Sequence, residues 1–310
     1  MTPIANPDLS VSFAGIELKN PIIAASGTFG YGVEFEDIVH LDRLGGLVVK
    51  GLSKEPMTGN PPPRLFETAA GMLNAIGLQN IGAPAFLTEK LPALREKKNV
   101  VVFANVFGYT RGDYEQTIEI LNQGEGIAAY EINVSCPNTA QGGIQFGSDP
   151  LLLDEVVRTA KRVASRPIIV KLSPNVTSIA QMAHVAEEAG ADAISLVNTF
   201  LAMAIDPETR RPRIANVTAG LSGPAIKPIA LRMVYDAAHA VKIPVIGMGG
   251  ITTPADVVEF LLAGASAVQV GTASYFDPVA TETLVADLTD YCREGRIERL
   301  SDLTGGLLTD

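Results

Sequence analysis

The chain has 310 residues, of which 47% are hydrophobic and 19% are charged, a composition that excludes disorder. A chain of this length buries most of the surface that its unfolded form exposes, so it needs no disulfide bonds. Its two cysteines exclude a disulfide scaffold and any four-thiolate metal site within the chain. The net charge of −10 disfavours binding to nucleic acids and anionic membranes. Residues 1–6 lack a signal-peptide pattern, so we expect a cytoplasmic protein. The composition is typical of a soluble enzyme, and no domain linker is visible, so we expect one domain over residues 1–310.

Short apolar runs, bounded by turn or polar residues, recur along the chain. Val and Ile are continuous in these runs rather than alternating with polar residues, which is typical of parallel strands covered on both faces. The predicted strands are Pro21–Ser26, Gly46–Lys50, Val100–Val106, Ala129–Ser135, Pro167–Leu172, Ala193–Asn198, Pro244–Met248 and Ala267–Gly271.

Segments with helical periodicity separate most of these strands. Asp149–Ser165 begins with an N-cap Asp and a Pro in the first turn. The other predicted helices are Ser178–Ala189, Lys227–Val241, Pro254–Ala263 and Pro278–Arg293. Eight strands alternating with helices predict an α/β fold, a (β/α)8 TIM barrel. A doubly wound sheet is the alternative, but no GxGxxG follows the first strand.

Three additions account for the extra length of the barrel. Leu9–Leu18, with a turn at Ala14-Gly15, is predicted to form an N-terminal β-hairpin that closes the bottom of the barrel. Leu52–Ala83 and Thr199–Pro228 are long insertions after strands 2 and 6. Both emerge at the C-terminal ends of strands, where TIM barrels build their active sites.

Polar residues collect at these C-terminal ends. They are Ser26, Lys50, Asn105, Asn133, Ser135, Cys136, Lys171, Asn198 and Thr199. Lys50 and Lys171 each follow an apolar run, and burial of an unpaired ammonium is costly. We therefore expect both lysines to meet a ligand anion; the alternative is an ion pair inside the barrel.

The last two strands are followed by glycine-rich loops, Gly247–Gly250 and Gly271-Thr272. Backbone N–H groups in such loops can hold an anion, and in TIM barrels the loops after strands 7 and 8 often bind phosphate. The pattern predicts a phosphate site; the alternative is that these glycines only form tight turns.

Cys136 lies directly after strand 4, within Asn133–Asn138 (NVSCPN). A free cysteine is more often a small buried hydrophobe, but this position favours a chemical role. No histidine lies nearby in the sequence, so a Cys–His nucleophile has no support. We interpret Cys136 as a general acid or base.

Several motifs occur together along almost the whole chain. They are Ala25–Gly27, Gly59–Pro61, Asn74–Asn80 (NAIGLQN), Asn133–Asn138, Val170–Asn175 (VKLSPN), Asn198-Thr199, Leu221–Pro228 (LSGPAIKP), Gly247–Ile251 (GMGGI) and Val270–Ala273 (VGTA). With these motifs the chain resembles the dihydroorotate dehydrogenases, the FMN-dependent barrels of pyrimidine synthesis. Within this family, Cys rather than Ser at position 136 resembles class 1. Gly71–Asn80 and Gly220–Pro228 resemble the NAD-linked class 1B rather than the fumarate-linked class 1A. Tyr109–Gly112 departs from the family and is expected to lie in a loop.

The resemblance implies oxidation of (S)-dihydroorotate to orotate. Cys136 would remove the C5 proton while the C6 hydride passes to flavin N5, and Lys171 would lie beside the flavin N1/O2 edge. FMN would be bound by Ser26, Lys50, Gly51, Asn105, Asn133, Lys171, Val197, Gly223, Gly249, Gly250, Gly271 and Thr272. The substrate would be bound by Lys50, Asn74, Ala75, Ile76, Gly77, Leu78, Asn133, Asn138, Asn198 and Thr199. No metal site is expected.

Class 1B also implies a partner. The family's complexes contain a homodimer of this chain with an electron-transfer subunit that carries FAD and a [2Fe-2S] cluster, which makes a heterotetramer. Two cysteines cannot ligate such a cluster, and the chain lacks a dinucleotide fingerprint. Four alternatives stay open: a dihydropyrimidine dehydrogenase-like flavin reductase, a class 1A enzyme, a Schiff-base lyase using Lys171, and a non-catalytic flavin carrier.

Overall fold

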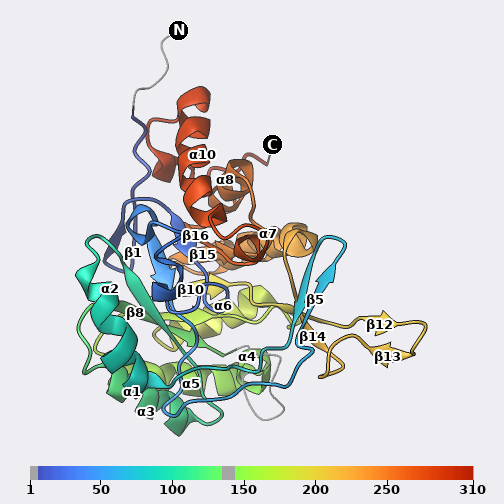
Figure 1. The fold of residues 1–310 in the computed structure, drawn as a ribbon. Helices are drawn as coiled ribbons and strands as arrows, with labels where there is room; N and C mark the ends of the chain where they lie inside the picture. Colours follow the sequence, from blue (N-terminus) through green and yellow to red (C-terminus); the bar gives the residue numbers. More distant parts are fainter. Residues whose placement is uncertain (1–5, 135–143, 310) are drawn as a thin grey trace.

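The computed structural model describes residues 6–134 and 144–309. Its centre is a closed barrel of parallel strands in the order β10-β15-β16-β3-β4-β7-β8-β9 (Figure 1). These strands are β3 (Ile22–Ala24), β4 (Gly46–Val48), β7 (Val102–Val106), β8 (Ile127–Asn133), β9 (Ile168–Lys171), β10 (Ala193–Leu196), β15 (Val245–Met248) and β16 (Ala267–Val270). All eight agree with the predicted runs to within 2 residues at each end, so the predicted TIM barrel is confirmed.

Helices surround the barrel. They are α1 (Ala83–Ala85), η3 (Phe86–Lys90), α2 (Leu91–Glu96), α3 (Arg111–Leu121), α4 (Ile144–Ser148), α5 (Pro150–Val163), α6 (Ile179–Glu188), α7 (Lys227–Ala240), α8 (Pro254–Leu262), α9 (Ala273–Phe276) and α10 (Ala280–Gly295). Short turns of 3-10 helix are η1 (Val33–Phe35), η2 (Leu41–Arg43), η4 (Pro224–Ile226) and η5 (Leu300–Leu303). The five helices that the sequence predicts are present. Within residues 6–134 and 144–309, no helix combines the length and the hydropathy that crossing a bilayer requires.

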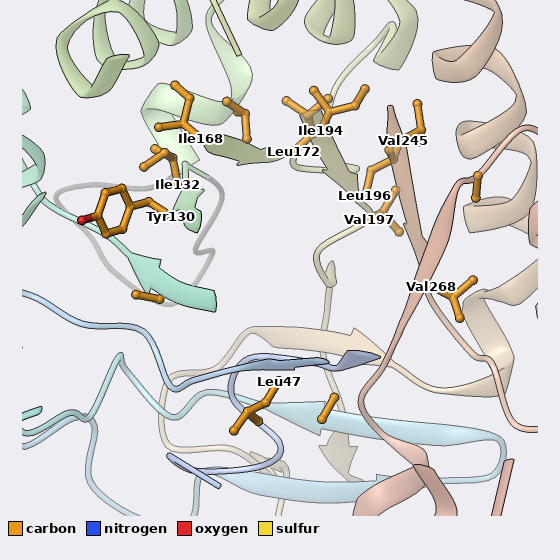
Figure 2. Close-up of a cluster of buried hydrophobic side chains, with 14 of the residues drawn as sticks. Leu47, Tyr130, Ile132, Ile168, Leu172, Ile194, Leu196, Val197, Val245 and Val268 are labelled. Carbon is orange, nitrogen blue, oxygen red and sulfur yellow. The ribbon is translucent and has the colours of Figure 1, made fainter. Parts of the chain in front are cut away.

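The main hydrophobic core lies between the barrel and these helices. Figure 2 shows Ile168, Ile194 and Val245 directed from their strands toward the surrounding helices. They belong to the same buried cluster as Val156 and Ala160 of α5. The helices cover the outer faces of the strands, so these faces need apolar residues as much as the inner faces do. This explains the continuous Val and Ile runs.

One segment differs from its prediction. Tyr109–Gly112 was expected to lie in a loop, but Arg111 and Gly112 begin helix α3. Thr110 caps this helix, because its side chain accepts a hydrogen bond from Asp113 N and Asp113 Oδ2 accepts one from Thr110 N. The prediction is therefore wrong for Arg111 and Gly112. The sequence signal was the Thr110–Asp113 capping pair, since this spacing is typical of a helix start.

The N-terminal hairpin is formed by β1 (Val11–Phe13) and β2 (Ile16–Leu18), as predicted. Its buried side chains form a cluster with residues of the barrel interior, and the Phe13 and Phe103 rings stack with centroids 6.1 Å apart. Ile23 and Ile169 belong to the same cluster. The hairpin thus closes the bottom of the barrel and leaves the C-terminal ends of the strands for a site.

The two long insertions pair with each other. β5 (Leu65–Thr68) and β6 (Gly71–Asn74) come from the first, and β11 (Phe200–Ala202) and β14 (Ala219–Ser222) from the second. They form one sheet in the order β11-β14-β6-β5, in which Gly220 lies opposite Asn74. β12 (Ile205–Asp206) and β13 (Arg211–Pro212) form a hairpin that extends away from the barrel (Figure 1). The sequence predicted both insertions but not this pairing.

Candidate active site

A pocket lies at the C-terminal ends of the barrel strands and includes residues of both insertions. Most of the predicted site residues line it: Ser26, Lys50, Gly51, Asn74, Ile76, Gly77, Leu78, Asn105, Asn133, Lys171, Val197, Asn198, Thr199, Gly223, Gly249, Gly250, Gly271 and Thr272. Ala75 does not, because it is fully buried in a separate small cluster with Leu73 and Ala219. Cys136 and Asn138 lie outside the described residues.

Glycines of the loops after β14 and β15 form one side of the pocket, the glycine wall. Gly249 and Gly250 follow β15 with φ angles of 130° and 73°, and Gly223 follows β14 with a φ of 97°. A Cβ atom on Gly250 would lie 2.7 Å from the carbonyl oxygen of Gly223. A Cβ atom on Gly249 would lie 2.7 Å from the Cβ of Ala230. Only glycine fits at these positions, and the bare backbone of these turns lines the pocket.

An ion pair supports this wall from behind. Lys227 Nζ donates to Asp256 Oδ1 over 2.6 Å, and Asp256 Oδ2 accepts hydrogen bonds from the backbone N–H groups of Thr252 and Thr253. Burial alone would raise the pKa of Asp256, but the hydrogen bonds from Lys227, Thr252 and Thr253 outweigh it and lower the pKa. The loop after β15 is thereby held in place by a carboxylate that stays charged at neutral pH.

The floor of the pocket is polar. Lys171 is only 6% exposed, and its Nζ lies 3.7 Å from Glu131 Oε2 in β8. Lys171 thus has a carboxylate partner inside the barrel, which was the alternative, and its contact with a ligand anion stays a prediction. Lys171 nevertheless lines the pocket, as does Lys50.

Asparagines from distant parts of the chain converge on the same pocket. Asn198 Nδ2 lies 3.3 Å from Asn133 Oδ1, and Asn74 Nδ2 donates to the carbonyl oxygen of Gly220 over 3.3 Å. Each amide carries both donor and acceptor atoms, so the group suits a flat ligand with N–H and C=O groups along its edge.

Two polar residues of the floor were missed by the sequence interpretation. Glu131 is fully buried, and Gln269 of β16 lines the pocket. The signal for Glu131 was a charged residue within an apolar run, Ala129–Ser135, because a carboxylate is almost never buried unless it is paired. In the described ranges, no group of three or more His, Cys, Asp or Glu side chains could hold a metal ion.

The donor set can be tested against a phosphate-bearing cofactor with a polar ring. The glycine wall offers backbone N–H groups for a phosphate. On the floor, Asn105 Oδ1 and Gln269 Oε1 are buried and have no hydrogen-bond partner among the described residues. Unsatisfied buried acceptors are rare, and here they lie in the pocket, where a ligand N–H group would satisfy them. The residues therefore fit a flavin nucleotide, and fold and site together define a TIM barrel with a pocket suited to a phosphate-bearing cofactor.

Comparisons with known proteins give the family. Residues 8–291 match the family model described as dihydroorotate dehydrogenase. The chain is 61% identical, over 97% of its length and 99% of the relative, to a Solibacter usitatus protein named provisionally as dihydroorotate dehydrogenase A (fumarate). It is 53% identical, over 99% of its length and 100% of the relative, to the dihydroorotate dehydrogenase B (NAD(+)) catalytic subunit of Geotalea uraniireducens. The Geobacter sulfurreducens protein of the same name is 53% identical over 97% of this chain and 98% of the relative.

The chain therefore belongs to the dihydroorotate dehydrogenase family, which implies a flavin cofactor. The resemblance that the sequence motifs indicate is confirmed. Most of the relatives named here are called catalytic subunits, a name that implies a partner subunit in those proteins.

Proposed function

We propose that the chain is the FMN-binding catalytic subunit of an NAD-linked, cytoplasmic dihydroorotate dehydrogenase, which oxidises (S)-dihydroorotate to orotate in pyrimidine biosynthesis. The observation that carries this proposal is that the glycine wall, a buried lysine and converging asparagines line the same pocket. The names of the Geotalea and Geobacter relatives support the NAD-linked class.

The proposed cofactor contacts are those that the family resemblance implies, and the lining of the pocket supports them. Gly249, Gly250, Gly271 and Thr272 would bind the phosphate of FMN, together with Gly223. The ring would lie over the floor, near Ser26, Lys50, Gly51, Asn105, Asn133, Lys171 and Val197. Bound FMN supplies a hydride acceptor. The positive charge of Lys171 beside it would stabilise the negative charge that reduction adds, which is electrostatic preorganisation.

The proposed substrate contacts lie on the insertion side of the pocket. Asn74, Ile76, Gly77 and Leu78 come from the first insertion, and Asn133, Asn198 and Thr199 from the ends of β8 and β10. Their amide groups would pair with the N–H and C=O groups of the orotate ring. Asn138 is proposed to bind substrate and Cys136 to remove the C5 proton; both lie outside the described residues.

Electrons must leave the chain after each turnover. We propose a homodimer of this chain with a partner subunit that carries FAD and a [2Fe-2S] cluster, in a heterotetramer. The two cysteines cannot ligate such a cluster, so a second polypeptide has to supply it.

Purification and steady-state kinetics test this proposal. The chain should be yellow and should release FMN on denaturation. It should oxidise dihydroorotate with artificial dyes, and it should reduce NAD⁺ only when the partner subunit is added. Rapid NAD⁺ reduction by the homogeneous single chain would contradict the partner route. Preference for dihydrouracil over dihydroorotate would indicate a dihydropyrimidine dehydrogenase-like reductase instead.

A fumarate-linked enzyme is the second candidate, because the 61% identical Solibacter usitatus relative carries the class A name. The same purified chain decides between the two. Turnover with fumarate at a rate comparable to that with dyes, without any partner, would favour class 1A.

A further inference from the structure

Glu131 lies at the centre of the polar floor and contacts side chains from four other barrel strands. It accepts hydrogen bonds from Asn105 Nδ2 over 2.6 Å, from Ser195 Oγ over 2.9 Å and from Gln269 Nε2 over 2.5 Å. Lys171 Nζ lies 3.7 Å from the same carboxylate. Glu131 is 0% exposed.

Such a residue is unusual inside a TIM barrel. The interior of these barrels is commonly filled by layers of branched apolar side chains, and the layer beneath Glu131 follows this rule with Ile23, Ile169 and Ile246. A buried ion pair generally contributes no more stability than apolar residues of the same volume. The position of Glu131 directly under the pocket therefore calls for a role other than packing.

The hydrogen bonds of Glu131 determine how two amides face the pocket. Asn105 and Gln269 both use their NH2 groups to bind the carboxylate, which turns their carbonyl oxygens away from it. These two oxygens are the buried acceptors without a partner among the described residues. A bound ring could satisfy them with N–H groups, so the carboxylate orients the acceptors that the cofactor meets.

Glu131 also determines the charge of the floor. The carboxylate offsets the positive charge of Lys171, and without it this charge is no longer compensated. At a separation of a few ångströms and away from water, such a charge acts strongly on a neighbouring ligand.

We propose that Glu131 is a positioning residue: it holds Lys171, Asn105 and Gln269 in place and, as the counter-charge of Lys171, lowers the reduction potential of the bound flavin. This inference rests on the proposed function, because the cofactor is FMN. Reduction gives the flavin two electrons and adds negative charge. Lys171 would stabilise this charge more strongly if Glu131 did not offset its own positive charge, so the potential would then be higher.

Replacement of Glu131 by glutamine tests the proposal. Glu131→Gln keeps the shape of the side chain: its amide oxygen can still accept from Asn105 Nδ2, and its NH2 group can donate to Ser195 Oγ. The midpoint potential of bound FMN is measured by equilibrium reduction against reference dyes, without dihydroorotate. We expect reduced FMN to gain at least about tenfold in affinity relative to oxidised FMN, which is about 30 mV for a two-electron couple. A potential that stays the same or falls would overturn the proposal.

Ser195→Ala is the matched control, because it removes a hydrogen bond to Glu131 without changing a charge. It should leave the potential unchanged. A rise equal to that of Glu131→Gln would show that the shape of the network, not its charge, sets the potential, and would overturn the proposal.

A second pair of variants covers the case in which Glu131→Gln does not fold. Lys171→Met leaves a lone buried carboxylate, whereas Lys171→Met with Glu131→Gln removes both charges. We expect the single variant to have the lower melting temperature and a potential at least about 30 mV below that of the double variant. Equal potentials would overturn the proposal. A wild-type chain that binds no FMN would instead refute the proposed function itself.

Discussion

Lys227 Nζ lies 2.6 Å from Asp256 Oδ1, and this contact joins two segments of the glycine wall. Lys227 begins α7 directly after η4, and Asp256 lies in the first turn of α8. The pair therefore connects the segment that carries Gly223 with the loop that carries Gly249 and Gly250. Because Asp256 also holds the N–H groups of Thr252 and Thr253, one carboxylate determines the shape of the loop after β15.

Loss of this ion pair should weaken both the fold and the phosphate site. We expect Lys227→Met to lower the free energy of unfolding by about 1–3 kcal/mol, between the values typical of exposed and buried pairs. FMN should also bind less tightly. Urea unfolding and FMN titration measure the two effects. Arg232→Met is the control, because Arg232 pairs with Asp236 on the same helix at the surface; it should change stability by less than about 0.5 kcal/mol. Equal effects of the two substitutions would contradict the prediction.

The same pair predicts a pH dependence. Hydrogen bonds to Asp256 and Glu259 raise the pKa of Lys227, whereas the pKa of Asp256 is lowered. The contribution of Asp256 is present above its unfolded pKa of about 3.9 and is lost as the pH falls through the lower folded value. The contribution of Lys227 to stability is fully present below its unfolded pKa of about 10.4, and it is lost as the pH rises through the higher pKa of the folded state. The stability difference between wild type and Lys227→Met should therefore be constant near neutrality and shrink at both extremes. Urea unfolding of both proteins from acidic to alkaline pH measures this difference. A difference in the free energy of unfolding that stayed constant down to a pH at which Asp256 is protonated would contradict the prediction.

A methyl group on the glycine wall should damage the site. At Gly249 the backbone has a φ of 130° and a Cβ atom would clash with Ala230, so we expect Gly249→Ala to cost about 1–3 kcal/mol and to weaken FMN binding. Gly112→Ala is the control. Its Cβ would meet nothing closer than 3.8 Å in helix α3, and it should stabilise the chain by up to about 1 kcal/mol. Wild-type FMN affinity in Gly249→Ala would show that this wall does not bind the phosphate.

The proposed base can be tested by single-turnover kinetics. Cys136→Ser should slow flavin reduction by dihydroorotate at least about a hundredfold, the lower range for general-base catalysis, while FMN and orotate still bind. In the wild type, the rate should rise toward the pKa of an ordinary thiol, about 8.5, because only the thiolate accepts the proton. Cys292→Ala is the control: burial in α10 raises the pKa of the Cys292 thiol, and its loss should leave the rate unchanged. A wild-type rate in Cys136→Ser would remove Cys136 from the mechanism.

Local patterns in the sequence were sufficient to predict the barrel. The apolar runs located its strands, because each strand is buried on both faces and its residues are therefore apolar without alternation. The ends of the runs then placed Lys50, Asn133 and Lys171 at one rim, because all strands of a parallel barrel point the same way. The helix at Arg111–Leu121 was missed although its capping pair is equally local.

Contacts between distant segments were decided only by the tertiary structure. Asn74 and Gly220 are 146 residues apart, and nothing in either insertion indicates that β6 and β14 would pair. Glu131 carried only the signal of a charge inside an apolar run. Its partners come from four other strands and become neighbours only when the barrel closes. Periodicity fixes which face a residue occupies, since this depends on its immediate neighbours, but the identity of the side chains that meet across the barrel depends on closure of the whole sheet.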